Sequence, residues 1–244
     1  MAFKMEAFAG LGGVLRKGHP GHDPDLPPCP LCGARAYKGY RFTRPDDIEH
    51  DCDCAYTRWD EYYAGVERAW RRWYYPRLYR ASLPEGYREL LGKPFRVKGN
   101  EGAAEAVEAW TLRGGLLYVY GPPGAGKTHL AVRAGWRRAE SGRRVAFFSE
   151  IDLMEEARRL ALGGEGVLLP GGSDLVVDGL GTARATPLAA ETVYLLLEGA
   201  RSGRFSLLAT GTLPPEDLAR RFGDVADALL ARLEGRAVPL RRTR

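Results

Sequence analysis

The sequence predicts an α/β domain built on a parallel sheet, preceded by a small cysteine-bearing module and a connecting helix. From about residue 101 onward, helical segments alternate with short, almost uninterrupted apolar strands, which is typical of a parallel sheet covered on both faces. All 4 cysteines lie between residues 29 and 54, which marks a separate module. We therefore expect three regions: a metal-binding module at 1–55, an aromatic and basic helix with its linker at 56–100, and the α/β domain at 101–244.

The composition is that of a globular protein. Of the 244 residues, 45% are apolar and 27% are charged, and the longest uncharged run, residues 114–126, is too short to span a membrane. The amino terminus contains Glu6 and several glycines, which argue against a signal peptide. We therefore expect a cytoplasmic protein. A net charge of +5 is compatible with a polyanionic partner but does not require one.

The helices and strands are expected in the following order. Residues 56–80 have apolar positions at helical spacing, and Pro76 is expected to end or kink this helix. Residues 81–100 are expected to form a linker with turns. In the α/β domain, the expected strands are 116–120, 145–149, 174–177, 205–209 and 237–240, and the expected helices are 101–113, 127–140, 151–162, 188–201 and two short ones within 214–234.

The cysteines have the spacing of a metal site. Cys29 and Cys32 form a C-x-x-C pair followed by glycine, and Cys52 and Cys54 form a second, tighter pair nineteen residues further on. Four thiolates suit a closed tetrahedral Zn²⁺ site, which stabilises a fold and leaves no open position for catalysis. An iron–sulfur cluster and unliganded thiols are the alternatives. His50 is a rival fourth ligand, and His19 and His22 are weaker ones.

The helix at 56–80 holds nine aromatic residues and six arginines. Such a mixture is able to stack bases and neutralise phosphates of single-stranded nucleic acid. Because Trp59, Tyr62, Val66, Trp70 and Trp73 form one helical stripe, packing against a core or a partner is the favoured interpretation. The arginines at 68, 71 and 72 remain a candidate phosphate-facing edge.

A glycine-rich loop predicts a nucleotide site. Residues 121–128, GPPGAGKT, match G-x-x-x-x-G-K-[ST] between an apolar strand and a helix start. Backbone N–H groups of such a loop cradle a polyphosphate, Lys127 reaches the β- and γ-phosphates, and the Thr128 hydroxyl binds Mg²⁺. The residues expected to contact ATP are Gly121, Pro122, Pro123, Gly124, Ala125, Gly126, Lys127, Thr128 and His129. Asp178, after the apolar run at 175–177, is expected to complete the magnesium site.

These motifs resemble those of AAA+ ATPases, and more narrowly of the DnaC/DnaI-type helicase loaders and the related IstB-like transposition ATPases. The resemblance covers about residues 80–240. It rests on four segments: GPPGAGKTHLA (121–131), DLVVDGLGTAR (174–184), LLATGTLPPEDLARRFGD (207–224) and ARLEGRAVPL (231–240). The resemblance implies that Arg232 is an arginine finger, acting on a neighbouring subunit's nucleotide. It also implies that Thr212 is the polar sensor of the fourth strand.

Two positions depart from the family's pattern. The family has a second acid directly after the strand-end Asp, and here that position is Gly179, which cannot orient water. The sensor position is commonly Asn, whereas Thr212 stands here. Glu150, at the end of the second strand, is an alternative source of the missing carboxylate. We therefore expect tight nucleotide binding with slow hydrolysis.

The resemblance implies a replicative helicase loader. Such a protein docks its zinc module on a hexameric DNA helicase, self-associates with ATP at the interfaces and engages single-stranded DNA. The alternatives are an IstB-like ATPase that activates a transposase on double-stranded DNA, and a non-hydrolysing ATP-binding adaptor. Arg241, Arg242 and Arg244 form a basic tail able to approach nucleotide or DNA.

Overall fold

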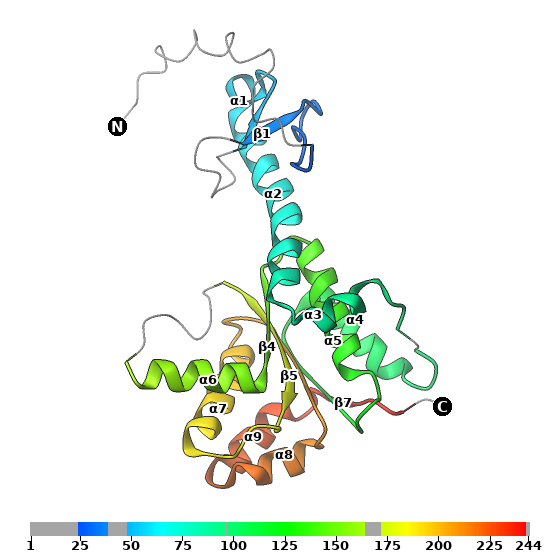
Figure 1. The fold of residues 1–244 in the computed structure, drawn as a ribbon, viewed down its shortest axis with the longest axis vertical. Helices are drawn as coiled ribbons and strands as arrows, with labels where there is room; N and C mark the ends of the chain where they lie inside the picture. The colour runs from blue at the N-terminus through cyan, green and yellow to red at the C-terminus, as the bar shows by residue number, and fades with distance from the viewer. Residues whose placement is uncertain (1–23, 39–47, 96, 164–171, 243–244) are drawn as a thin grey trace. The chain divides into compact units, whose positions relative to one another are not determined.

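The structure, a computed structural model, describes residues 24–38, 48–95, 97–163 and 172–242. The chain divides into two compact units, Met1–Tyr74 and Tyr75–Arg244. Their division falls inside the long helix α2, Trp59–Ser82 (Figure 1). None of the helices in the described ranges is both long and apolar enough to cross a membrane.

The first unit is a small hairpin packed on helices. Strands β1 (Ala36–Lys38) and β2 (Ile48–His50) pair antiparallel, and the short helix α1 (Cys54–Thr57) leads into α2. The sequence reasoning did not foresee this hairpin, because three-residue strands carry too little apolar pattern to be seen. Its core is made of buried apolar residues from both strands, from α2 and from the segment before β1: Leu26, Cys29, Ala36, Ile48, Tyr62, Val66 and Trp70.

Pro76 was expected to end or kink helix α2, and the helix continues through Pro76 to Ser82, so the first of these two alternatives is wrong. A proline in a helix interior removes one backbone hydrogen bond and crowds the preceding turn. Tertiary packing compensates here, since Tyr79 and Leu83 in the following turn are fully buried. The Tyr79 hydroxyl also donates a hydrogen bond to the carbonyl of Val132, 3.2 Å away. The linker expected at 81–100 contains α3 (Glu85–Arg88) and a 3₁₀ turn, η3 (Glu89–Gly92).

The second unit contains a five-stranded parallel sheet, which confirms the predicted fold class. Its strand order is β4-β5-β6-β3-β7. The strands are β3 (Leu116–Tyr120), β4 (Val145–Ser149), β5 (Asp174–Leu180), β6 (Leu207–Gly211) and β7 (Ala237–Pro239). Because all strands are parallel, their carboxyl ends meet at one edge of the sheet, where ligands bind in open α/β folds.

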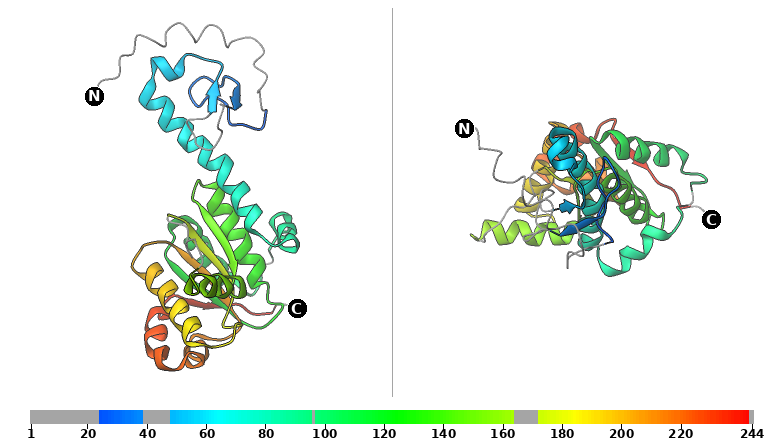
Figure 2. Two further views of the ribbon diagram at one scale, coloured as in Figure 1. Left: turned by 60° about the vertical axis from the view of Figure 1, so that its left-hand side comes forward. Right: turned by 90° about the horizontal axis from the view of Figure 1, so that it is seen from above.

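Helices cover both faces of the sheet (Figures 1 and 2). Neighbouring residues of a strand point to opposite faces: Leu207 and Ala209 pack on one side and Leu208 on the other. One face is covered by α6 (Glu150–Ala161), α7 (Pro187–Arg201), α8 (Pro215–Arg221) and α9 (Ala226–Leu233). The other is covered by α4 (Glu101–Arg113), α5 (Lys127–Glu140) and the end of α2.

Strand β5 is three residues longer than expected and irregular near its end. Its pairing with β6 is regular from Leu175 to Val177 and resumes only at Leu180. Gly179 lies within this bulge with φ of +83°, a conformation that other residues adopt only at a cost. The irregularity displaces the backbone of Asp178 and Gly179 from the β5–β6 ladder at the carboxyl edge of the sheet.

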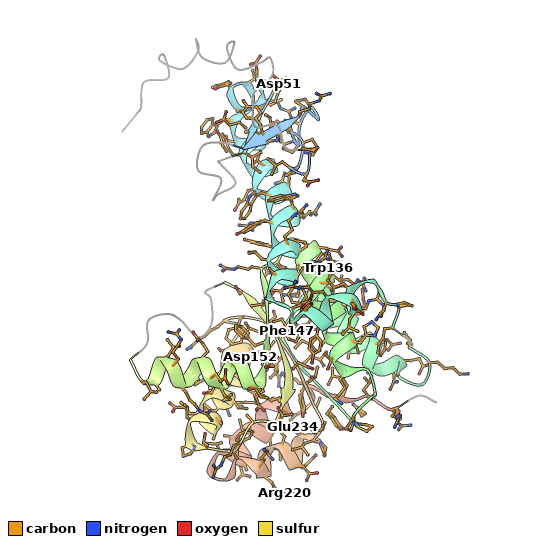
Figure 3. All side chains as sticks on the ribbon, in the orientation of Figure 1. Asp51, Trp136, Phe147, Asp152, Arg220 and Glu234 are labelled. Carbon is orange, nitrogen blue, oxygen red and sulfur yellow. The ribbon has the colours of Figure 1, made fainter. Side chains whose placement is uncertain are left out.

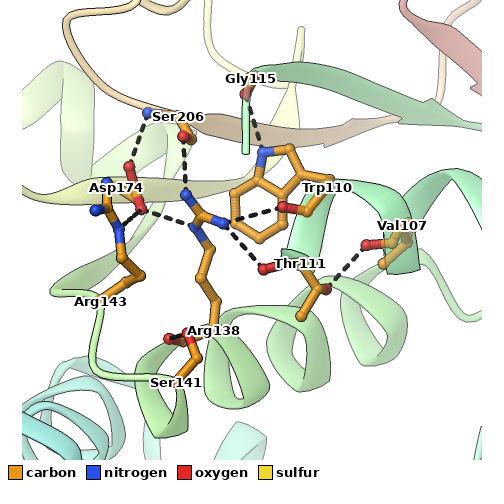
Figure 4. A network of polar contacts seen from close by, with 9 residues as sticks. All are labelled: Val107, Trp110, Thr111, Gly115, Arg138, Ser141, Arg143, Asp174 and Ser206. Atoms are coloured by element: carbon orange, nitrogen blue, oxygen red, sulfur yellow. Dashed lines mark hydrogen bonds and ion pairs between the residues drawn. The ribbon is translucent and has the colours of Figure 1, made fainter. Parts of the chain in front are cut away.

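A buried polar network holds the amino end of the sheet together (Figure 4). The Arg138 guanidinium, from α5, donates to the Asp174 carboxylate at 2.7 Å and to the Ser206 hydroxyl at 3.1 Å. It also donates to the carbonyls of Trp110 and Thr111 at the end of α4. Arg138 and Asp174 are almost completely buried. One guanidinium thus joins α4, α5, β5 and the start of β6.

Candidate functional site

The phosphate loop lies where the sequence predicts, between β3 and α5. Gly121 and Gly126 have φ of +152° and +89°. A Cβ at Gly121 would lie 2.0 Å from the carbonyl oxygen of Leu240, so no side chain fits there. Pro122, Pro123, Gly124 and Ala125 form the turn between these glycines, and α5 begins directly at Lys127. The helix N-terminus therefore points its free N–H groups towards the loop, as anion binding requires.

Lys127 is held by the loop itself. Its ammonium group donates hydrogen bonds to the carbonyl oxygens of Gly121 at 2.8 Å and Pro122 at 2.9 Å. Burial lowers the pKa of Lys127, and the nearby Asp178 carboxylate opposes that shift. A partly desolvated ammonium bonded only to neutral carbonyls is well prepared to bind an anion, because a phosphate is the stronger partner.

Asp178 collects hydroxyl groups from three other elements. Thr128, on α5, lies 2.9 Å and 3.0 Å from its two carboxylate oxygens. Thr210, on β6, donates to one of them at 2.5 Å, and Tyr87, on α3, lies 3.5 Å from the other. The structure therefore brings together the two residues predicted to bind magnesium. An Asp carboxylate beside a Thr hydroxyl offers the hard oxygen ligands that Mg²⁺ prefers.

Tyr87 belongs to the wall around this carboxylate. Its ring packs edge-on against Phe147 of β4, with 5.7 Å between ring centroids (Figure 3 labels Phe147). Burial and the Asp178 carboxylate raise the pKa of Tyr87. Sequence reasoning missed Tyr87 and Thr210, because nothing in a single sequence shows which hydroxyl faces a given carboxylate.

Glu150 faces the loop that follows β5. It is fully buried, and its carboxylate accepts from the backbone N–H groups of Gly181 at 3.0 Å and Ala183 at 2.5 Å, and from the Thr182 hydroxyl. These bonds occupy both oxygens in fixing that loop. Glu150 thus stabilises the segment after Gly179. A carboxylate that replaced the missing catalytic acid would need a free oxygen, and both oxygens of Glu150 are already hydrogen-bonded.

The two residues assigned by resemblance lie in different settings. Thr212 follows β6 and is exposed. Arg232, on α9, is largely buried: it forms an ion pair with Glu198 at 2.8 Å and donates to the Tyr194 hydroxyl at 2.8 Å. Its guanidinium also lies over the Tyr194 ring, 4.3 Å from the centroid. Arg232 is thus engaged with α7 of its own chain.

The surroundings of the phosphate loop come from residues 93–95, 97–100 and 240–242. The His129 ring is 2.9 Å from the Lys93 carbonyl oxygen and packs edge-on against Phe95. Asn100 uses both side-chain amide atoms on the backbone of Arg241, at 3.0 Å and 2.7 Å. This double contact fixes the segment after β7, and the Arg242 side chain lies beside Gly124.

The four cysteines converge on one point, with their sulfur atoms all within 4.8 Å of one another. A tetrahedral site with Zn–S bonds of about 2.3 Å has sulfur–sulfur edges of about 3.8 Å, so this donor set fits zinc. The Cys29 N–H bonds to Ala34 O, and Gly33 N–H bonds back to Cys29 O, forming the turn of the first pair. The Ala34 N–H lowers the pKa of Cys32, whereas burial raises that of Cys52.

His50 is not one of the converging ligands. Its Nδ1 is 2.6 Å from the Tyr62 hydroxyl, and its Nε2 is 3.2 Å from the carbonyl of Pro27. With both ring nitrogens occupied, this buried histidine fastens β2 to α2. His19 and His22 lie outside the described residues.

The aromatic stripe of α2 is divided. Tyr62, Val66 and Trp70 are buried in the first unit, as packing predicts, whereas Trp59 is 60% exposed and its ring lies tilted against that of Tyr63. Tyr56, on α1, is 61% exposed. The arginines at 68, 71 and 72 are exposed, and Arg71 pairs with Glu67 on the same helix.

The sheet order and the phosphate loop together define an ATP-binding protein of the AAA+ class. The chain belongs to the family of IstB-like ATP-binding proteins, whose profile matches residues 106–240. It is 34% identical over 143 residues to a putative insertion sequence ATP-binding protein of Sinorhizobium fredii. That match covers 57% of this chain and 47% of the relative, so the chain spans about half the length of the curated relative.

Solved structures show the same fold. The DnaC helicase loader matches with a TM-score of 0.53 at 22% identity, over 66% of this chain and all of that one. Domain III of DnaA from Thermotoga maritima matches with a TM-score of 0.52 at 19% identity, over 65% and 68% of the two chains. DnaI matches with a TM-score of 0.50 at 18% identity, over 66% and 92%. Identities this low show likeness of fold alone.

Proposed function

We propose that this protein binds ATP with Mg²⁺ at the phosphate loop and uses the nucleotide as an assembly switch. The observation that carries the proposal is the contact of Thr128 with Asp178, next to a Lys127 ammonium that has only neutral partners. In this assignment, Lys127 contacts the β- and γ-phosphates, residues 121–129 surround the nucleotide, and Thr128 and Asp178 hold the metal ion. Thr212 is the candidate sensor of the γ-phosphate.

The proposed cellular role is that of a loader for a replicative hexameric helicase. The cysteine module, with zinc held by Cys29, Cys32, Cys52 and Cys54, would dock on the helicase. The second unit would self-associate through ATP and engage single-stranded DNA. Two findings support this role: the fold is that of known loaders, and a module with four converging cysteines, able to hold a metal ion, precedes the family domain.

Arg232 is the proposed arginine finger. In the structure its charge is neutralised by Glu198 and its guanidinium is held by Tyr194. A finger must present that charge to the γ-phosphate of a neighbouring subunit. The proposal therefore requires assembly to release Arg232 from Glu198, and the variant Glu198→Gln is expected to ease that release.

We propose that ATP hydrolysis is slow. Gly179 stands where a second acid would orient the attacking water, and the Glu150 carboxylate is engaged by residues 181–183. A direct test replaces Gly179 by Asp, with Gly179→Ala as the control for backbone strain at φ of +83°. Faster hydrolysis in Gly179→Asp alone supports an otherwise competent site. Equal rates in all three proteins favour a non-hydrolysing adaptor.

A second candidate role is activation of a transposase on double-stranded DNA. It is favoured by the insertion sequence relative, which is 34% identical over 143 residues. The nucleotide site would be used in the same way in both roles, so the partner protein distinguishes them.

The experiment is light scattering of the full chain mixed with its organism's replicative helicase, with and without ATP and Mg²⁺. The loader role predicts a defined complex that depends on the cysteine module and changes in Lys127→Ala. Lys98→Ala, which removes an exposed lysine, is the matched control and should behave like the native protein. Absence of a complex in every nucleotide state contradicts the loader role and favours the transposition role.

A further inference from the structure

We propose that Thr210 is a positioning residue for the magnesium-binding carboxylate of Asp178. The inference rests on the proposed function, because it concerns the same nucleotide site. The family resemblance implies a role for a different threonine, Thr212, two residues further along the chain. Thr210 is 1% exposed, and its hydroxyl lies between β6 and the bulge of β5.

Both hydrogen-bonding directions of the Thr210 hydroxyl are committed. It donates its one proton to the Asp178 carboxylate at 2.5 Å and accepts from the backbone N–H of Gly179 at 3.1 Å. A hydroxyl has a single proton, so the bond from Gly179 directs that proton towards Asp178. Threonine is also restricted at χ1. The geometry therefore fixes the carboxylate from β6, the strand that pairs with β5.

The position of Thr210 follows from the sheet register. Val177 pairs with Ala209 and Leu180 with Gly211, so Thr210 faces the interrupted stretch that holds Asp178 and Gly179. The ladder cannot satisfy the Gly179 N–H at this break, and the Thr210 side chain accepts from it instead. Without that hydroxyl, the partly buried N–H of Gly179 loses its partner and the Asp178 carboxylate loses a donor.

Thr128 and Thr210 have different tasks at the same carboxylate. Thr128 lies within 3.0 Å of both oxygens and, as a proposed ligand, must present its own oxygen to Mg²⁺. Thr210 belongs to β6, the strand that pairs with β5, and in this proposal it keeps its contact with Asp178 when Thr128 binds the metal. Groups that orient a ligand in this way change metal affinity by about 10–100-fold when removed.

The test is a Mg²⁺ titration of nucleotide affinity in the full chain, using a fluorescent ATP analogue. In Thr210→Val we expect the Mg²⁺ concentration for half-maximal tightening to rise about tenfold or more, with unchanged affinity in excess chelator. Thr210→Ser keeps the hydroxyl and should restore the native value. Thr192→Val is the matched control, because the Thr192 hydroxyl is buried and bonds only to Leu188 of its own helix.

Several outcomes overturn the inference. One is an unchanged Mg²⁺ dependence in a folded Thr210→Val protein. Another is an equal loss of affinity with and without Mg²⁺, which would mean a structural role alone. If Thr210→Val does not fold, Thr210→Cys decides: a sulfhydryl is a weak donor, so the same increase is expected, and its absence overturns the inference. A native protein that binds no nucleotide would contradict the proposed function instead.

Discussion

Among single residues, Arg138 has the largest expected effect on stability, because its buried charge has buried partners on α4, on β5 and just before β6. If it were removed, the carbonyls at the end of α4 would lose their donor and the buried Asp174 carboxylate would keep only the exposed Arg143 as a cationic partner. Breaking a buried ion pair from one side costs about 3–5 kcal/mol. We therefore expect Arg138→Leu to lower the free energy of unfolding by about that amount, measured by denaturant unfolding.

Arg143 provides the control for this prediction. It contacts the same carboxylate at 3.5 Å, but its side chain is 61% exposed, against 4% for Arg138. Exposed pairs contribute about 0–1 kcal/mol, so Arg143→Leu should be nearly neutral. Equal effects of the two substitutions would contradict the assignment of the stability to the buried network.

The nucleotide site shows how far single residues are predictable. The phosphate loop and Asp178 were predictable because each is defined by residues that are neighbours in the sequence. The loop is a glycine pattern before a helix, and Asp178 is an acid directly after an apolar run. Thr210 and Tyr87 were not, because their approach to Asp178 depends on strand register and on the path of α3. The bulge in β5 could not be predicted either. In the sequence, Gly179 shows only that a glycine replaces the family's second acid, and its positive φ becomes known only from the structure.

Among the structural elements, the cysteine hairpin is the one that we expect to depend on a bound metal. Strands of three residues and a small core do not stabilise a fold alone, and we expect metal binding by the four cysteines to supply that stability. We expect one zinc ion per chain by elemental analysis. After chelation, we expect rapid proteolysis within 24–58 while nucleotide affinity is retained. A metal-free protein with the same protease resistance would contradict this.

The carboxyl end of α2 could not be predicted from the sequence pattern of the helix alone. Local preference predicts that Pro76 ends or kinks the helix, and the burial of Tyr79 and Leu83 beyond it keeps the residues helical. The strands of the α/β domain were predictable within about three residues, because each is a nearly continuous apolar run. The hairpin strands were not, because they have no such run.

For the molecule as a whole, we expect the buried tyrosines to limit the stability of the fold at alkaline pH. Burial raises the pKa of Tyr79 and of Tyr118 above the usual value of about 10. The folded state therefore keeps these protons where the unfolded state loses them. Their contribution to stability is complete below about pH 10 and is lost as the pH rises through the folded values.

We accordingly expect unfolding at alkaline pH, with cooperative release of tyrosine protons seen by ultraviolet absorbance. Tyr79→Phe removes one such group and should move the midpoint of alkaline unfolding to higher pH. Tyr56→Phe, which removes an exposed hydroxyl, is the control and should leave the midpoint unchanged. A midpoint unaffected by Tyr79→Phe would contradict this account.

The clamp between Asn100 and Arg241 has a practical consequence for handling the protein. It holds the residues after β7 against the phosphate loop, with Leu240 packed on Gly121 and Arg242 beside Gly124. An affinity tag fused after residue 244 would begin three residues beyond Arg242, and we expect it to interfere with nucleotide binding at the phosphate loop. Purification and assays are therefore better served by a tag at the amino terminus, which belongs to the other unit.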